Sequence, residues 1–267
     1  MEGRGGSGTE PGGHGGDGAH NGRVEPGEIP LAGGNMGTVT RLGDKVRRQA
    51  GPWTANVHRL LDVYADAGID QTPRALGFTA DGRERLTFLP GTVANDPRAW
   101  LWTAAILAAA GRLVRRLHDA SVPLAGITEG WRSPVHTPAE VVCHNDLAPY
   151  NLVFDDGLLR GLIDFDYASP GPRAWDLAYL AYTLAPLNGE PVFTASERRL
   201  RVDVLVDAYG PGPTAEAVLA AVPPKLDELA AFSDRMAVEL ANPELAVHAS
   251  RYRADAARLR TSRLAPG

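Results

Sequence analysis

The sequence predicts an α+β fold with two lobes: a reduced, sheet-based N-terminal lobe and a larger, mainly helical C-terminal lobe. Between residues 38 and 89, short apolar runs are separated by Gly-Asp and Asp-Gly pairs, a pattern typical of β-hairpins. From about residue 98 onward, apolar residues recur mostly at helical spacing. We therefore divide the chain into a glycine-rich tail (1–30), an N-terminal lobe (31–89) and a C-terminal lobe (90–267).

Length and composition narrow the class of protein. With 267 residues and a hydrophobic content of 44%, the chain can bury a sizeable core. The formal net charge of −5 argues against nucleic acid as the main partner. Cys143 is the one cysteine, so no disulfide can form within the chain, and its position favours a buried strand residue over a reactive thiol. The longest apolar run, 100–110, is too short to cross a bilayer, so we expect a cytoplasmic protein without a membrane partner.

The tail, residues 1–30, is dominated by glycine and contains almost nothing that a core could bury. Such a segment cannot offset the entropy lost on ordering, so the tail is predicted to be disordered. The fold is expected to begin near Leu31.

A glycine-rich stretch opens the N-terminal lobe, where Gly33-Gly-Asn-Met-Gly37 leads into a hairpin made of 38–42 and 45–49. The backbone N–H groups of such a loop can cover nucleotide phosphates, which makes Gly34 and Gly37 candidate binding residues. Taken alone, the pattern describes a flexible connection equally well.

The rest of the N-terminal lobe is predicted as a helix followed by a second hairpin. Residues 54–67 place apolar side chains at i, i+3, i+4 and i+7, with Thr54 in the position of an N-cap. Residues 74–79 and 83–89 flank an Asp-Gly turn. Phe88-Leu-Pro-Gly91 then leads into the C-terminal lobe.

Helical patterns dominate the C-terminal lobe. Asp176, at the start of one helix, is expected to bind backbone amides of the polar loop described below. Asp227, Glu228 and Asp234 are candidates to attract a cationic substrate, although a solvated helix face explains them equally well. The predicted helices are 98–119, 175–187, 196–209, 215–221, 225–240 and 243–261.

The most informative stretch lies between the first two of these helices. An apolar strand, 141–143, stops at His144 and Asp146, and Asn151 opens a hairpin that delivers Asp164 at its far end. Two carboxylates and an amide oxygen converging on strand ends are oxygen ligands that suit Mg²⁺. A carboxylate not bound to metal can take a proton from a hydroxyl, which completes the set of groups needed for phosphoryl transfer.

These residues carry a family resemblance. His144-x-Asp146-x-x-x-x-Asn151, followed by Ile163-Asp164-Phe165-Asp166, resembles the catalytic loop and metal-binding segment of the aminoglycoside phosphotransferase-like kinases. The later Trp175-Asp-Leu-Ala178 resembles a segment that these enzymes carry after the metal-binding Asp. The resemblance implies a protein-kinase-like fold.

The resemblance also implies a reaction: transfer of the γ-phosphoryl group of ATP or GTP to a hydroxyl of a small molecule. It implies that Asp146 accepts or orients the hydroxyl proton, that His144 braces the loop, and that Asn151 and Asp164 hold Mg²⁺. Relatives accept aminoglycosides, macrolides, sugars and choline-like compounds, so the family alone does not select the acceptor.

Two further roles follow from the resemblance. The strand position that carries a phosphate-binding cation falls on Arg47, with Arg48 as the alternative because a one-residue slip exchanges the two faces. The segment around Phe88 and Leu89 is where family members hold adenine through backbone groups. The helix glutamate that pairs with the cation is missing, and His58 and Asp62 are the nearest polar residues. These departures leave an alternative open: a catalytically weak or inert kinase-like nucleotide-binding scaffold that acts through partners.

Overall fold

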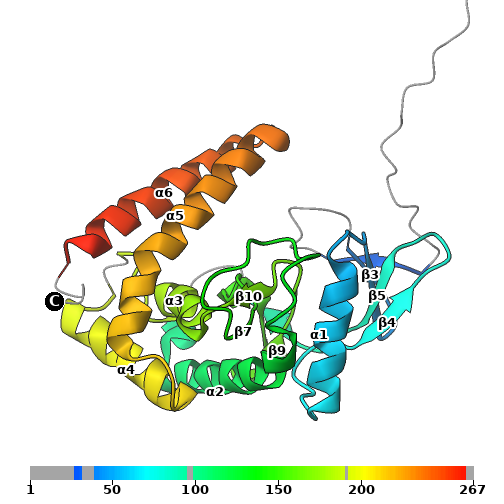
Figure 1. The fold of residues 1–267 in the computed structure, drawn as a ribbon, viewed down its shortest axis with the longest axis horizontal. Helices are drawn as coiled ribbons and strands as arrows, with labels where there is room; N and C mark the ends of the chain where they lie inside the picture. The colour runs from blue at the N-terminus through cyan, green and yellow to red at the C-terminus, as the bar shows by residue number, and fades with distance from the viewer. Residues whose placement is uncertain (1–26, 32–38, 95–98, 190–191, 263–267) are drawn as a thin grey trace, which may run out of the picture.

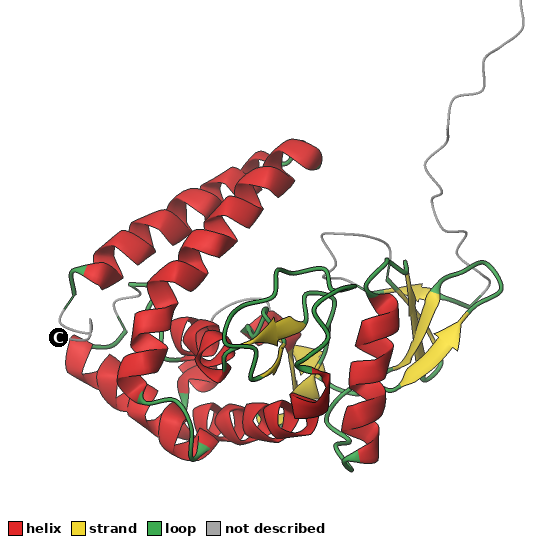
Figure 2. Ribbon diagram, viewed as in Figure 1, coloured by secondary structure: helices red, strands yellow, loops and turns green. Residues whose placement is uncertain are grey.

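The computed structural model describes residues 27–31, 39–94, 99–189 and 192–262. Figure 1 shows a small sheet with one helix at one end of the molecule and a larger group of helices at the other, and Figure 2 separates strands from helices by colour. The predicted two-lobed α+β fold is therefore confirmed. Gly34, Gly37 and residues 1–26 of the predicted tail lie outside the described residues.

The N-terminal lobe is built on an antiparallel sheet with strand order β1-β2-β3-β5-β4. Its two central hairpin turns contain Gly43 and Gly82, whose φ angles of +62° and +82° favour glycine. The two predicted hairpins are thus present. The strands are β1 Ile29–Pro30, β2 Thr40–Leu42, β3 Lys45–Arg48, β4 Ala75–Phe78 and β5 Glu84–Thr87.

Ile29 and Pro30, which we assigned to the tail from the sequence, form strand β1 of this sheet. β1 pairs with β2, and the buried Glu28 carboxylate receives hydrogen bonds from Arg47 and Arg83. Two arginines on neighbouring strands give this carboxylate charged partners, and composition alone does not reveal such long-range pairing.

Helix α1, Thr54–Asp66, packs beside the sheet and buries Val57, Leu60, Leu61 and Tyr64 as predicted. The predicted N-cap is wrong by one residue: Trp53 holds the N-cap position, and Thr54 is the first helical residue. The Thr54 hydroxyl instead accepts a hydrogen bond from the Gly51 amide at 2.9 Å, which orders the turn that enters the helix.

The C-terminal lobe begins with β6 (Thr92–Val93), the 3₁₀ turn η1 (Ala99–Trp102) and the long helix α2 (Ala104–Ser121), followed by η2 (Val122–Leu124). Two small sheets lie beside α2. β7 (Val141–Cys143) pairs with β10 (Ser169–Gly171), and β8 (Leu152–Asp155) lies between β6 and β9 (Leu158–Leu162). The chain between β7 and β8 contains the 3₁₀ turn η3, Pro149–Asn151.

Four helices complete the lobe: α3 Arg173–Leu184, α4 Ala195–Tyr209, α5 Ala215–Glu239 and α6 Pro243–Arg260. Figure 1 shows α5 and α6 side by side as a long hairpin that projects from the rest of the lobe. The sequence predicted two helices where α5 runs unbroken through Pro223 and Pro224. Each proline removes one backbone hydrogen bond, and the packing of α5 against α3 and α6 compensates for that loss.

One hydrophobic core joins the two lobes at α1. Tyr64 of α1 meets the ring of Phe165 with centroids 5.6 Å apart, so the helix of the N-terminal lobe packs directly on the predicted metal-binding segment. No helix in the described part of the chain is long and apolar enough to cross a membrane.

Candidate active site

The loop after β7 is held by one buried carboxylate. Asp176, at the start of α3 and 1% exposed, accepts hydrogen bonds from the backbone amides of His144 at 2.6 Å and Asn145 at 2.8 Å. Asn145 has a φ of +68°, an αL geometry that Asn tolerates better than most residues. The expectation that Asp176 binds amides of this loop is confirmed.

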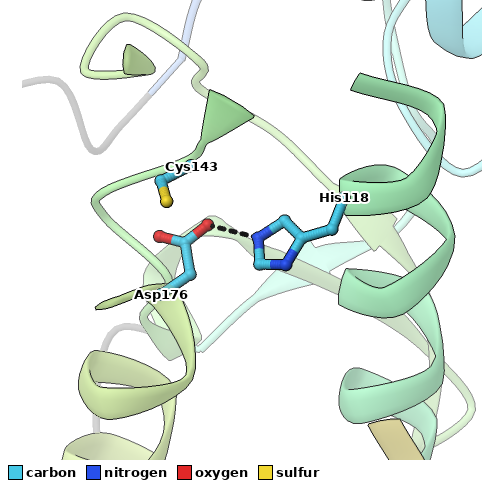
Figure 3. Close-up of side chains that lie close together, drawn as sticks. All are labelled: His118, Cys143 and Asp176. Carbon is cyan, nitrogen blue, oxygen red and sulfur yellow. Dashed lines mark hydrogen bonds and ion pairs between the residues drawn. The ribbon is translucent and has the colours of Figure 1, made fainter. Parts of the chain in front are cut away.

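Figure 3 shows that His118 of α2 and Cys143 of β7 face the same carboxylate. The His118 ring lies 3.1 Å from an Asp176 oxygen, and potential ligand atoms of the three residues lie within 4.8 Å of one another. Burial favours protonation of Asp176, but its hydrogen bonds with His118 and the loop prevail and lower its pKa. Burial raises the pKa of the Cys143 thiol. Because both Asp176 oxygens already accept N–H groups, we interpret this cluster as a brace for the loop.

His144 links the two halves of the motif. Its Nδ1 accepts the Asp146 amide at 3.2 Å, so Nε2 carries the proton and donates to the Ile163 carbonyl at 3.0 Å. The imidazole also meets Phe165 edge-on, with centroids 4.7 Å apart. These contacts tie the residue before Asp164 to the loop that carries Asp146.

Asp146 lies at the centre of the site. Its Oδ2 accepts the Asn151 side-chain amide at 3.0 Å, and its Oδ1 accepts the Tyr150 hydroxyl at 2.5 Å. Burial raises the pKa of Asp146, and the charge of Asp164 raises it further, while the Tyr150 hydrogen bond opposes the shift. The carboxylate is therefore a stronger base than an ordinary aspartate, which suits proton acceptance.

Asn151 and Asp164 are brought together by the hairpin. The Ile163 amide donates to the Asn151 carbonyl at 2.9 Å, which fixes the end of β9 beside the loop. Asp164 follows with a φ of +64°, and its side chain is 43% exposed. The structure thus brings Asp164 next to the loop that carries Asp146 and Asn151, as the sequence spacing predicted, and near enough to Asp146 for its charge to raise the pKa of that carboxyl.

The donor set fits Mg²⁺. The Asn151 Nδ2 donates to the carbonyl and to Oδ2 of Asp146, which leaves Oδ1 of the amide as a free oxygen ligand. Asp164 is among the more exposed of the site's carboxylates and has one oxygen, Oδ1, in an ion pair. An amide oxygen and an exposed carboxylate are the hard oxygen ligands that Mg²⁺ takes beside substrate phosphates.

The structure places Arg48, not Arg47, beside the metal-binding segment. Arg48 donates to Oδ1 of Asp164 at 2.8 Å and to Oδ1 of Asp166 at 2.5 Å. Arg47 instead donates to Glu28 at 2.7 Å, on the opposite face of β3. Because alternate residues of a strand point to opposite faces, only one of the two arginines can face the site. The alternative considered from the sequence therefore has the geometry of the phosphate-binding cation.

A glutamate does pair with this arginine, but it comes from a strand. Glu84 of β5, directly opposite Arg48 in the sheet, receives Arg48 Nε at 2.5 Å and lies 3.0 Å from the ring of His58 on α1. Burial opposes ionisation of Glu84, yet His58 and Arg48 lower its pKa. Burial also favours the neutral form of Arg48 and so lowers its pKa. The negative charges of Asp166, Glu84 and Asp164 outweigh this effect and raise the pKa above the usual value. The helix thus holds the cation indirectly, through His58 and Glu84.

Asp166 and Arg132 complete the charged network. Arg132 lies 3.5 Å from Asp166, and its guanidinium is stacked between Trp53 and Tyr167, at 4.3 and 4.5 Å from the ring centroids. Burial raises the pKa of Asp166, although Arg48 opposes the shift. Since Trp53 precedes α1, this stack connects the N-terminal lobe to the site.

The linker between the lobes, around Phe88 and Leu89, offers few free backbone groups that could bind the adenine ring of a nucleotide. The Phe88 amide is already bonded to the Asp44 carbonyl at 2.7 Å, and its ring is covered by the Arg41 guanidinium at 3.7 Å. Leu89 has no backbone hydrogen bond to the described residues. Of the two residues predicted to hold adenine, Leu89 is the one whose amide makes no backbone hydrogen bond within the described part of the chain, and its role remains a prediction.

The acidic candidates on α5 are all paired. Asp227 and Asp234 bind Arg260 and Arg253 of α6, so they join the two helices of the hairpin. Glu228 lies 2.7 Å from His136 and 3.8 Å from the buried Lys225. These contacts favour a structural role over attraction of a cationic substrate.

Several residues of the site were missed at the sequence level: Tyr150, Glu84, Arg132 and Lys225. Lys225 is fully buried on α5, with Nζ 5.2 Å from the Trp175 ring centroid, and burial lowers its pKa. Two local signals were available: Tyr150 directly precedes Asn151, and Lys225 is one of only two lysines. Glu84 and Arg132 had none, because they reach the site only through strand pairing and lobe packing.

Comparison with known proteins places the chain among phosphotransferases. Residues 131–219 match the model of the phosphotransferase enzyme family. The trifolitoxin immunity protein of Rhizobium leguminosarum bv. trifolii is 32% identical over 196 residues, which cover 68% of this chain and 74% of that relative.

Solved structures with the same fold include a macrolide 2′-phosphotransferase from Brachybacterium faecium, at 16% identity and a TM-score of 0.57, covering 84% of this chain and 90% of that one. An ethanolamine kinase from Plasmodium vivax has 12% identity and a TM-score of 0.62, covering 88% of this chain and 82% of that one. At this level of identity the likeness concerns the fold.

Proposed function

The chain belongs to the phosphotransferase enzyme family, and from this premise we propose that it transfers the γ-phosphoryl group of ATP or GTP to a hydroxyl of a small molecule. The observation that carries the proposal is the convergence of Asp146, Asn151 and Asp164 beside the Arg48 guanidinium. This reaction needs three kinds of group: a base, oxygen ligands that hold a metal ion, and a cation beside the phosphates. These groups suffice because the catalysis depends on positioning and electrostatics.

In this mechanism Asp146 accepts the proton of the acceptor hydroxyl. Its Oδ2 accepts the Asn151 amide, so Oδ1, which accepts the Tyr150 hydroxyl in this structure, is the oxygen that an acceptor hydroxyl would approach in place of Tyr150. Asn151 Oδ1 and the Asp164 carboxylate would hold Mg²⁺, which neutralises phosphate charge when bound. Arg48 would move from Asp164 and Asp166 toward the phosphates, while Glu84 keeps its position. His144 and Asp176 hold the loop in place.

The same geometry weighs against the inert scaffold. That alternative rested on the missing helix glutamate, on the shortened glycine loop and on arginine in place of lysine. The glycine loop lies outside the described residues. Glu84 now supplies a carboxylate for Arg48, and His58 of α1 supplies the link to the helix. A scaffold would have no need for a network that holds the Arg48 guanidinium against Asp164 and Asp166.

The acceptor is the open part of the proposal. Relatives differ in what their names report: one confers immunity to trifolitoxin, one phosphorylates a macrolide and one ethanolamine. The acceptor screen should cover toxins and macrolides first, since the relative with 32% identity is named as an immunity protein for trifolitoxin and one structural neighbour as a macrolide phosphotransferase. Release of ADP or GDP that depends on the added compound would identify the acceptor class.

The nucleotide site is tested by thermal melting of the full chain with ATP or GTP, with and without Mg²⁺. Binding to the folded state adds about 2.7 kcal/mol to the unfolding free energy at a ligand concentration 100-fold above Kd, and the melting temperature rises accordingly. Asp164→Asn should reduce the metal-dependent part. Asn suits the φ of +64° at this position, so the backbone is preserved.

Asp156→Asn is the matched control, because Asp156 also has a positive φ, +49°, and is exposed at the far turn of the same hairpin. We expect it to respond to Mg·ATP like the wild type. No metal-dependent stabilisation of the wild type by either nucleotide would refute the proposed function.

A further inference from the structure

The hydroxyl of Tyr150 already makes the hydrogen bond to Asp146 that an acceptor hydroxyl must make with this base. Tyr150 donates a hydrogen bond to Asp146 Oδ1 at 2.5 Å, while Asn151 occupies the other carboxylate oxygen. A general base must lie within hydrogen-bond reach of the group whose proton it takes, and the Tyr150 hydroxyl is in direct hydrogen-bond contact with Asp146. Tyr150 thus contacts the Asp146 oxygen that the Asn151 side chain leaves available for a hydroxyl donor.

Tyr150 is also accessible. Its side chain belongs to η3, between Asp146 and the metal-side residue Asn151, and the residue is 42% exposed. The hydroxyls of Tyr179 and Tyr252 continue a chain away from it, at 3.4 and then 3.2 Å. Among the described residues, Tyr150 is the only tyrosine whose hydroxyl contacts Asp146.

We propose that Tyr150 is an internal phosphoryl acceptor, which the protein phosphorylates when Mg·ATP is bound and no external acceptor is present. This inference rests on the proposed phosphotransferase function. The Tyr150 oxygen forms a bond to the γ-phosphorus, and the bond from that phosphorus to the β–γ bridging oxygen breaks. ADP leaves, and the phenolic proton passes to Asp146. The products are phosphotyrosine, ADP and one proton, with no change of oxidation state.

The geometry predicts the stoichiometry and the order of the reaction. Phosphotyrosine carries about −1.5 to −2 charges and would lie against the Asp146 carboxylate, so transfer stops after one phosphoryl group per chain. Because donor site and acceptor belong to one molecule, the rate per molecule is independent of protein concentration.

The test incubates the full chain with Mg·ATP labelled in the γ-phosphoryl group, without an added acceptor. Intact mass and peptide mapping report the extent and position of labelling. We expect at most one group per chain, on Tyr150, and background labelling in Tyr150→Phe and Asp146→Asn. Tyr252→Phe removes a hydroxyl from the same chain of tyrosines without touching Asp146, so it should be labelled like the wild type.

Melting curves taken in parallel show that each variant is folded and whether it binds Mg·ATP. If the wild type is stabilised by Mg·ATP but Tyr150 stays unlabelled, the inference is wrong while the nucleotide site stands. Unchanged labelling in Tyr150→Phe, or a rate that rises with protein concentration, overturns it as well. If Mg·ATP neither stabilises nor labels the wild type, both this inference and ATP as donor in the proposed function fail.

Discussion

Replacement of Arg48 by methionine tests the central charge network. Arg48 joins three carboxylates, and its side chain is 12% exposed. Glu84 is 1% exposed and would keep only His58 as a partner, a change that costs about 3 kcal/mol for a carboxylate left in a buried position. Asp164 and Asp166 reach solvent at 43% and 16% exposure, so each adds less, on the order of 0.5 kcal/mol.

The expected loss for Arg48→Met is therefore about 4 kcal/mol of unfolding free energy, or roughly 10 °C in Tm for a chain of this size. Denaturant unfolding and thermal melting measure it. The same variant should also lose most of its stabilisation by Mg·ATP, because the guanidinium is the cation proposed to meet the phosphates.

Arg47→Met is the matched control on the same strand. Its partner Glu28 keeps a second arginine, Arg83, so the stability loss should be smaller, about 1–2 kcal/mol, with the response to Mg·ATP intact. Equal stability losses and equal nucleotide responses in the two variants would refute the assignment of Arg48 to the site.

Two further perturbations test the brace and the contact between the lobes. Asp176 has a lower pKa in the folded protein than an unfolded aspartate, whose pKa is about 4, so its ionised form stabilises the fold above about pH 4. This contribution is lost as the pH falls through the pKa of Asp176 in the folded protein. Asp176→Asn should thus be about 3 kcal/mol less stable than the wild type near pH 7, and the gap should narrow below about pH 4 in denaturant titrations; a constant gap would contradict this account. Gly161→Ala places a methyl group 2.2 Å from the Gln71 carbonyl oxygen, so it should lower Tm by several degrees and weaken Mg·ATP binding. In the control Gly126→Ala the added methyl group meets no atom within 4 Å, so Tm and Mg·ATP binding should not change. Equal effects of the two substitutions would show that this contact carries no strain.

Much of the active site followed from local sequence because its parts are close in the chain. Asp146 and Asn151 belong to one loop, and a single hairpin returns Asp164 to it. Strand and turn chemistry act over a few residues, so the spacing of polar groups at strand ends was enough to predict that they meet. The same holds for Asp176, whose place at the start of a helix pointed to bonds with nearby amides.

Errors arose where local signals compete with packing. Pro223 and Pro224 read as a helix break, yet α5 continues through them because its neighbours α3 and α6 hold it. The predicted tail wrongly included Ile29 and Pro30, which form β1 by pairing with β2, next to a Glu28 carboxylate held by Arg47 and Arg83. In both cases the deciding contacts come from distant segments.

The sequence by itself determined the family and the two-lobed α+β class, and it singled out Asp146, Asn151 and Asp164 as the proposed base and metal ligands, because these inferences depend on residue types at short, regular spacing. The tertiary structure decided that Arg48 faces the site and that Glu84, from a strand, pairs with it in place of a helix glutamate. It also decided that the Tyr150 hydroxyl donates a hydrogen bond to Asp146. A shift of one residue in strand register exchanges Arg47 and Arg48 between faces, and register is set by pairing with β5. The physical reason is that side-chain direction and long-range pairing are properties of the packed chain.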